Sequence, residues 1–347
     1  MNSILITILI IGVIIVVHEL GHYIAAKAAG VRVDEFAVGM GPKIFGIKHG
    51  ETDYSLRAIP LGGYVRMAGM DPEEKNDERG FNSKTILQRM VVIFAGSFMN
   101  FLLAIVLFIM LYSFIGINVP VHSNIVGQVV DGYPAERVGL QEGDQLTAIN
   151  GETVNDWTEI TQIIQQNLEN SLTITVQRDD TTLQVNIVPE KNPQTGLGMI
   201  GIRPTGEPIY VYTHTYPFWE GVIRGTQESI DWLVTFVNSF VRLITGQASV
   251  DYLAGPVGIV QMTGEASEHG FRVLLWFAAL LSLNIGFINL LPIPFLDGSR
   301  LVFLGIEGVR GKPLDPAKEN LVHLVGFALL IILVIFVTYN DILRILN

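Results

Sequence analysis

The sequence contains no cysteine among its 347 residues. Disulfide frameworks and thiolate metal sites are therefore excluded, and any bound metal must be held by His, Asp or Glu. Charge is also scarce, because 16% of the residues are charged whereas soluble domains average roughly 25%. The net charge of −11 argues against a nucleic-acid partner. With 49% hydrophobic residues, gathered in runs, the chain is expected to be an integral membrane protein.

No basic residue precedes the first apolar run, which extends from Ile4 to Val17. The basic n-region and the small-residue cleavage site of a signal peptide are missing, so we expect a retained transmembrane helix. Crossing a bilayer takes about 20 helical residues, and three later apolar segments are also long enough. Four transmembrane helices are therefore predicted, at residues 4–28, 90–117, 273–291 and 321–339.

Basic residues are distributed unevenly between the segments that join these helices. The segment 27–89 holds 10 of the 22 Lys and Arg residues, whereas segment 118–216 holds four, against 12 acidic residues. The positive-inside rule then places segment 27–89 in the cytoplasm, and both termini and segment 118–216 outside. The membrane core is accordingly expected in two halves, residues 1–117 and 271–347.

Residues 118–203 are expected to form an inserted extracytoplasmic α+β domain. A stretch with turn residues at Asn150 and Gly151 leads into the alternating segments "LTITVQ" and "LQVNIV", which are typical of strands. The segment "AERVGLQEGDQLTAINGE" resembles a PDZ domain, a module that binds extended peptides by adding a strand to a sheet edge. The alternative is a structural β-module without a ligand. The fold class predicted is thus a polytopic α-helical membrane protein with a PDZ-like insertion.

Residues 204–270 are expected to be an amphipathic and linking segment. Within it, residues 217–245 mix aromatic and charged residues. Two interpretations stay open for this stretch: a helix lying on the outer membrane surface, or a soluble helix packed on the PDZ-like domain.

The first apolar segment carries the motif H-E-x-x-H at His18, Glu19 and His22. On a helix His18 and His22 are separated by one turn and about 40° of rotation, so both imidazoles can face one metal ion. Glu19 lies on the flank of that face, where it can accept a proton from an attacking water. The alternative is a pair of core histidines with hydrogen-bond partners. Because polar groups inside a membrane are costly and usually functional, a metal site is favoured.

Zinc needs a third protein ligand, and Asp297 in "NLLPIPFLDG" (289–298) is the candidate. Pro292 and Pro294 cannot continue a helix, and irregular backbone at membrane depth must be buried or line a wet cavity. An ordinary interfacial turn is the alternative, and the local sequence does not decide between them. The topology does, because it places Asp297 and the H-E-x-x-H motif at a similar depth on the cytoplasmic side.

Each of three asparagines could either take part in the chemistry of the site or join two helices by packing. Asn100 lies one turn after Gly96 in the second apolar segment, near the same depth as the motif. It could bind the substrate or the metal-bound species, or it could join two helices. Asn284 and Asn289 present the same alternatives, and Asn289 is favoured for the site because it borders the proline-broken segment.

With these residues in place, the chain resembles the site-2 protease family of intramembrane zinc metalloproteases, in its bacterial form with a single PDZ domain. The segments "HELGH", "GSFMN" and "NLLPIPFLDG" match its H-E-x-x-H, G-x-x-x-N and N-x-x-P-x-P-x-L-D-G motifs. The resemblance implies Zn²⁺ as cofactor and regulated intramembrane proteolysis of single-pass proteins, such as anti-sigma factors or remnant signal peptides, in a bacterial cytoplasmic membrane. It implies His18, His22 and Asp297 as zinc ligands, Glu19 as general base, and Asn100 and Asn289 as assisting residues.

Residues 39–69 are expected to form a β-hairpin at the inner membrane face, with its turn near 49–51. In the family resembled, such an element lies next to the active site, where its edge could hold an unwound substrate as an added strand. A plain interfacial hairpin is the alternative. For the whole chain, the competing interpretation is a non-enzymatic membrane protein: a zinc-binding transporter, or a scaffold with a PDZ adaptor.

Overall fold

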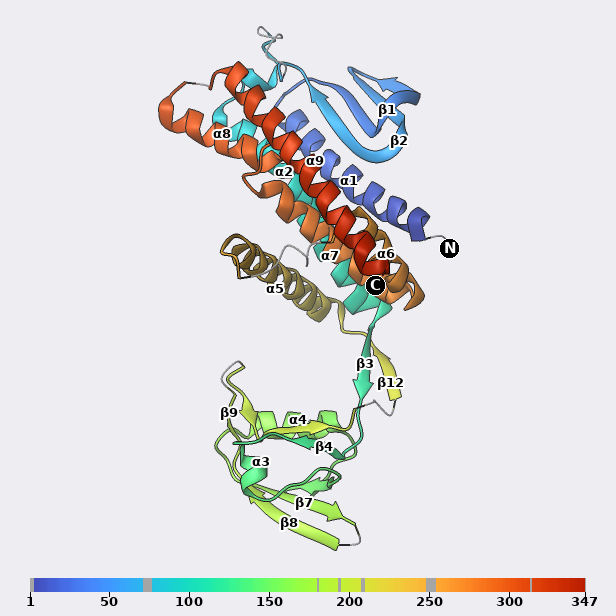
Figure 1. Cartoon of the computed structure of the whole chain (residues 1–347), viewed down its shortest axis with the longest axis vertical. Coiled ribbons are helices and arrows are strands. Elements are labelled where there is room, and N and C mark those ends of the chain that lie inside the picture. The colour runs from blue at the N-terminus through green and yellow to red at the C-terminus, as the bar shows by residue number, and fades with distance from the viewer. Residues whose placement is uncertain are drawn as a thin grey trace. The chain divides into compact units, whose positions relative to one another are not determined.

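The computed structural model describes residues 3–70, 77–179, 181–192, 195–206, 210–247, 254–312 and 314–346. The chain forms two compact units. One holds Met1–Gly116 together with Thr215–Asn347, and the other holds Ile117–His214. The first is a helical unit with a β-hairpin, and the second is an α/β unit (Figure 1).

Within the described residues of the helical unit, four helices are long and apolar enough to cross a membrane. They lie where the sequence predicts apolar spans, which is in keeping with a multi-pass membrane protein. These helices are α1 (Ser3–Ala28), α2 (Ile86–Met110, prolonged by the π-helical turn Leu111–Ile115), α7 (Phe271–Leu290) and α9 (Pro316–Leu346).

Both α1 and α7 pack against α2, and glycine makes these contacts close. A Cβ atom at Gly21 of α1 would meet the backbone of Ala95 in α2. A Cβ atom at Gly286 of α7 would lie 2.8 Å from Phe101 and 3.2 Å from Asn100 of α2. Such small residues let helix backbones approach each other in a membrane. The position of α2 is therefore fixed from two sides.

Helix α5 (Phe218–Ile244) is the amphipathic segment predicted at 217–245, and it packs against α2 and α7. Neither of the two interpretations included this packing, and a position on the outer membrane surface stays a prediction. Gly225 allows the packing, because a Cβ atom there would lie 2.9 Å from the backbone nitrogen of Ile109. The ring centroids of Trp232 and Trp276 lie 5.6 Å apart, so aromatic contact adds to the packing of α5 on α7.

The predicted hairpin is present and longer than expected, because its first strand begins at Val33. Strands β1 (Val33–His49) and β2 (Thr52–Met67) pair antiparallel around the turn at Gly50. Next to the turn, where residues 39–59 lie, several large apolar side chains are exposed. These are Met40, Ile44, Phe45, Ile47, Leu56 and Ile59.

The hairpin also has a buried charge. The carboxylate of Glu35 accepts hydrogen bonds from Ser55 at 2.7 Å, Arg57 at 2.6 Å and Tyr64 at 2.7 Å. Burial alone would raise the pKa of Glu35, but these hydrogen bonds favour the charged form and lower its pKa to about 2. The cluster therefore fastens β1 to β2 by side chains as well as by the backbone ladder.

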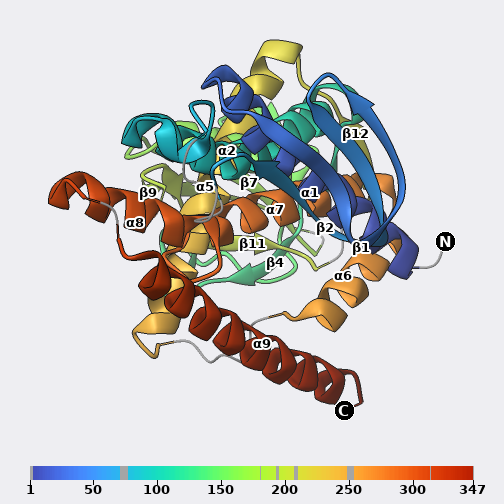
Figure 2. The same ribbon diagram turned by 90° about the horizontal axis from the view of Figure 1, so that it is seen from above.

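Shorter helices join the long ones. The unit also contains the 3₁₀ turn Phe81–Ser83, α6 (Pro256–Glu268) and α8 (Asp297–Arg310). Helix α8 is joined to α2 by a partly buried ion pair, in which Arg89 donates to Glu307 at 2.5 and 3.1 Å. Figure 2 shows α9 at the margin of the unit, with α8 and α6 near its two ends.

The α/β unit has a four-stranded antiparallel sheet in the order β6-β5-β7-β8. Its buried core includes Leu146, Ile160 and Ile174, and Arg178 forms an ion pair with the buried Asp144 at 2.7 Å. The unit extends to His214, beyond the domain end at 203 expected from the sequence. Its elements are β3 (Ile117–Val121), β4 (Val126–Val129), α3 (Pro134–Arg137), β5 (Gln145–Ile149), β6 (Glu152–Thr153), α4 (Trp157–Gln166), β7 (Leu172–Arg178), β8 (Thr181–Ile187), β9 (Glu190–Lys191), β10 (Gly198–Met199), β11 (Ile202–Pro204) and β12 (Tyr210–His214).

Candidate metal centre

Two imidazoles of α1 converge inside the helical unit. His18 and His22 are 8% and 7% exposed, although both are polar and lie on an apolar helix. Their Nε2 atoms are 3.2 Å apart, and their ring centroids are 4.8 Å apart. The one-turn spacing of the motif thus brings both rings to one point, as the helix period requires.

The carboxylate of Asp297 reaches the same point from the other half of the chain. Its Oδ2 atom lies 3.1 Å from Nε2 of His18 and 3.2 Å from Nε2 of His22. Asp297 is the first residue of α8, directly after the irregular segment that ends α7. Gly298 is required beside it, because a Cβ atom there would meet the carbonyls of Leu290 and Leu291. The Asp-Gly pair therefore lets the chain turn back closely over the end of α7.

The three donor atoms fit a zinc ion. Zinc–ligand bonds of about 2.0 Å in tetrahedral geometry require the ligand atoms to be about 3.3 Å apart, and the three separations here are 3.1, 3.2 and 3.2 Å. Nδ1 of His22 donates to the carbonyl of Val92 at 2.9 Å, which leaves the Nε2 lone pair directed at Asp297 and His18. A backbone carbonyl that fixes the tautomer in this way is the usual support of a zinc-binding histidine.

Asn100 is fully buried and lies on the far side of the His18 ring from Asp297. Its amide nitrogen is 3.3 Å from Nδ1 of His18, while its Oδ1 atom is buried without a hydrogen-bond partner. The two ends of an amide are assigned from their hydrogen bonds. With the amide turned over, Oδ1 accepts the Nδ1 proton of His18, and the Nε2 lone pair becomes free for a metal ion. This orientation of the amide is the one that fits His18 as a ligand, and it puts the amide nitrogen where the oxygen without a partner was.

Gly96 of α2 lies directly against both imidazoles. A Cβ atom at this position would meet Nε2 of His22, and it would lie 2.8 Å from Cε1 of His18. The α2 backbone therefore forms one wall of the site, which is possible only with glycine at this position.

Glu19 lies on the flank of the histidine face and is partly exposed. Strand β2 passes beside it, because a Cβ atom at Gly63 would lie 3.0 Å from Cγ of Glu19. Among the described residues, the Glu19 carboxylate has no hydrogen-bond partner. It is therefore free to receive a proton beside the three donor atoms.

The two asparagines of α7 are not part of this cluster. Asn289 is partly exposed near the end of α7, and within the described chain no hydrogen bond joins it to His18, His22 or Asp297. Asn284 is likewise partly exposed. A contact between Asn289 and a substrate remains a prediction.

Comparison with known proteins agrees with this geometry. The sequence profile described as Peptidase family M50 matches residues 6–333. The chain belongs to this family. The M50 peptidase is 35% identical to the regulator of sigma-W protease RasP of Bacillus subtilis over 428 aligned positions, which cover 99% of each chain. It is 34% identical to the zinc metalloprotease RasP of Geobacillus kaustophilus, with 99% of this chain and 98% of that one covered.

A protein of Clostridium acetobutylicum, named provisionally as a zinc metalloprotease, is 38% identical over 347 positions, with 99% and 98% of the two chains covered. Among solved structures, the PDZ domain of the SdrC-like protein of Listeria monocytogenes is 26% identical, covering 24% of this M50 peptidase and 86% of that chain, with a TM-score of 0.21. Family membership confirms the predicted site-2 protease resemblance and, with the relatives' names, the predicted zinc metalloprotease. It favours that prediction over a transporter or scaffold.

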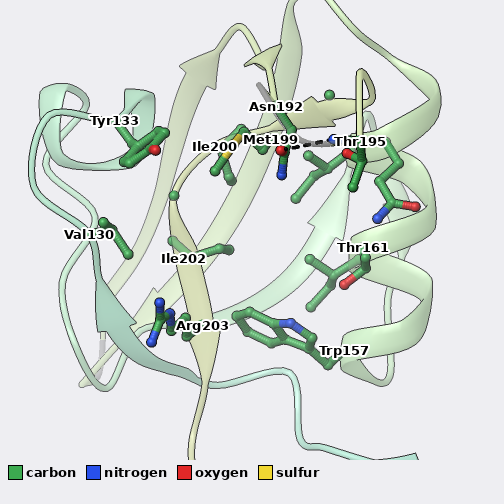
Figure 3. Close-up of a pocket in the computed structure, with 15 residues that line it drawn as sticks. Val130, Tyr133, Trp157, Thr161, Asn192, Thr195, Met199, Ile200, Ile202 and Arg203 are labelled. Atoms are coloured by element: carbon green, nitrogen blue, oxygen red, sulfur yellow. Dashed lines mark hydrogen bonds between the residues drawn. The ribbon is translucent and has the colours of Figure 1, made fainter. Parts of the chain in front are cut away.

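Outside the metal centre, the α/β unit of the M50 peptidase has a cavity of about 270 Å³ between α4 and β11 (Figure 3). Trp157 and Thr161 of α4 line one side, and Ile202 and Arg203 of β11 line the other. Strand β11 pairs with β4 on one edge. The cavity therefore combines an apolar wall, a positive charge and a nearby strand.

Sequence reasoning overlooked one residue near the centre. The fourth apolar segment, residues 321–339, contains no Asp, Glu, Lys or Arg, and His323 is its one histidine. Ionisable residues within a membrane are functional candidates by default, so the signal was present in the sequence. In the structure His323 contacts the segment that leads to Asp297.

Proposed function

We propose that this M50 peptidase cleaves single-pass membrane proteins within their transmembrane segments, with zinc held by His18, His22 and Asp297. One observation carries the proposal: three donor atoms from apolar, membrane-length helices and their junction meet within 3.2 Å of one another. Polar groups are expensive in such surroundings, and a zinc ion would use all three.

Bound zinc supplies Lewis acidity, which activates water near neutral pH and polarises a carbonyl group. The chain's own groups do the rest. Glu19 accepts a proton from the attacking water, whose oxygen forms a bond to the carbonyl carbon of the scissile peptide. The C–N bond then breaks, and Glu19 passes the proton to the leaving amine nitrogen. Asn100 holds His18 through Nδ1, and Asn289 contacts the substrate strand.

The substrate must be unwound before this step, because a helix hides its peptide groups in its own hydrogen bonds. Strand β2 lies beside Glu19, and an extended substrate segment could pair with the hairpin as an added strand. The exposed apolar side chains near the hairpin turn suit a segment drawn from a membrane. Anti-sigma factors and remnant signal peptides are the proposed substrates.

The proposed sidedness follows the charges. We place both termini and the PDZ-like domain, residues 118–203, outside the cytoplasmic membrane, with residues 204–270 linking it to the second half of the core. The hairpin and α8 face the cytoplasm, where Arg300 and Arg310 add positive charge. Water then reaches the site from the cytoplasmic side.

The cavity between α4 and β11 is the proposed peptide site of the PDZ-like domain. An extended peptide would add to β11, with its apolar side chain against Ile202 and a terminal carboxylate near Arg203. Trimmed substrates would present such ends. Replacing Ile202→Asp should abolish binding of a carboxy-terminal peptide to the full chain. Unchanged binding would indicate instead that the domain excludes bulky substrates by its size.

The proteolytic assignment is tested with a Glu19→Gln variant. This variant should keep its zinc and lose cleavage of a purified transmembrane substrate by at least about 100-fold, because a general base typically contributes 10²–10⁴-fold. The matched control is Glu268→Gln, an exposed glutamate of α6, which should cleave normally. Normal cleavage by Glu19→Gln would refute the mechanism. Unchanged zinc content in Asp297→Ala would refute the ligand set.

A further inference from the structure

Helix α9 is the least embedded of the apolar helices. In its most apolar window 11% of the residues are buried, against 28%, 39% and 33% for α1, α2 and α7. Near its beginning, nevertheless, it makes specific contacts with the segment between α7 and α8. These contacts involve a polar group, a ring pair and a glycine, so they are more than a loose apolar packing.

The polar contact joins His323 to the backbone two residues before Asp297. The N–H group of Phe295 donates to Nδ1 of His323 at 3.0 Å. The other ring nitrogen, Nε2, carries the proton in this tautomer, and it lies 3.8 Å from Oε1 of Glu319. His323 is thus an acceptor aimed at a single backbone group.

Further contacts on the same face of α9 hold the segment in place. The rings of Phe295 and Phe327 have centroids 4.9 Å apart. A Cβ atom at Gly326 would clash with the ring of Pro294, so α9 can approach the segment only because glycine is there. Positions 323, 326 and 327 lie on one helical face, and that face touches residues 294–295.

Phe295 needs such support because its backbone is strained. Its φ angle is 81°, a region that bulky residues rarely adopt and that persists only where the surroundings enforce it. Strain of this kind gathers where a functional group has to be aimed. Here the turn at Phe295 sets the direction in which the chain enters α8, and thereby the place of the Asp297 carboxylate.

We propose that His323 is a positioning residue for the metal ligand Asp297. By accepting the Phe295 N–H, it holds the strained turn in the conformation that places Oδ2 of Asp297 at 3.1 and 3.2 Å from the two histidines. The inference rests on the proposed zinc site. Helix α9 would then hold the third ligand in position, although α9 supplies no ligand itself.

The test measures zinc affinity, by competition with a chelator, on the purified full chain in lipid nanodiscs. His323→Leu removes the acceptor and should weaken zinc binding about 10- to 100-fold, the range found for groups that support metal ligands. His323→Asn can place an oxygen where Nδ1 was and should stay close to the wild type. Leu324→Ala, at an exposed neighbouring position of α9, is the matched control and should not change the affinity.

A second variant separates the strained turn from general damage to α9. Glycine adopts positive φ angles freely, so adding Phe295→Gly to His323→Leu should recover a part of the lost zinc affinity. The same substitution in the wild type should give no such gain in zinc affinity. Wild-type affinity in His323→Leu, equal losses in the Leu and Asn variants, or no recovery with glycine would each overturn the inference. If the unmodified chain bound no zinc, the proposed function itself would fail, so the two failures are distinguishable.

Discussion

Replacing Gly96→Ala should strongly weaken zinc binding at the candidate metal centre by adding a single methyl group. The new Cβ atom would lie 2.8 Å from Cε1 of His18 and nearer still to Nε2 of His22. Carbon atoms in contact are about 3.5 Å apart or more, so the His18 ring would have to withdraw by about 0.7 Å and the His22 ring by more. Metal–ligand distances tolerate about 0.2 Å. Helix α2 cannot yield instead, because α7 packs against it through Gly286.

Zinc affinity should therefore fall by at least about 100-fold, which corresponds to about 2.7 kcal/mol. Competition with a fluorescent chelator on the purified protein measures this directly, and cleavage of a membrane substrate should fall with it. Gly12→Ala in α1 is the matched control, since a Cβ atom there meets nothing within 4 Å; alanine should be neutral or slightly stabilising in that helix. Wild-type zinc affinity in Gly96→Ala would refute the reasoning, because it would show that the rings do not hold the metal in this arrangement.

Two more predictions concern stability. The pKa of Glu35 is about 2 instead of 4.5, so its carboxylate stabilises the hairpin above pH 4.5, and this contribution is lost as the pH falls toward 2. Hydrogen exchange of the hairpin amides should therefore accelerate over that pH range in the wild type and less in Glu35→Gln. Equal acid sensitivity of the two proteins would contradict the prediction. Asp341 of α9 accepts a hydrogen bond from the N–H of Gly258 at 2.7 Å, at the beginning of α6. Asp341→Ala should therefore lower the free energy of unfolding by about 1–2 kcal/mol, and Asp341→Asn should lower it less, as measured by thermal unfolding. Equal stability of the two variants would argue against this cap.

Helix periodicity and membrane depth predicted much of the centre. The one-turn spacing of His18 and His22 is a property of any α-helix, and the structure brings their Nε2 atoms to 3.2 Å. Asp297 could be matched to them only through topology, since the local sequence equally allowed an interfacial turn. The structure brings its carboxylate to the same point, and its role as a ligand remains a proposal.

Tertiary contacts lay beyond the sequence. The sequence left open whether Asn100 takes part in the chemistry or in helix packing. Only the fold shows its amide beside Nδ1 of His18, and support of a zinc-binding imidazole by Asn100 is a proposal. The positive φ of Phe295 has no signal in the sequence, because bulky residues usually avoid that region. The sequence also did not predict the packing of α5 on α2 and α7, because small residues such as Gly225 show their purpose only when the partner helix is known.

The order of the metal-centre groups along the chain bears on how the peptidase is made. His18 and Asp297 are 279 positions apart, and the whole α/β unit is synthesised between them. During synthesis α1 emerges with both histidines and Glu19, but without the carboxylate of Asp297 that completes the cluster. The cluster of His18, His22 and Asp297 therefore comes together only near the end of translation, once α7 and α8 have followed. A growing chain consequently carries an incomplete cluster until α8 has been made.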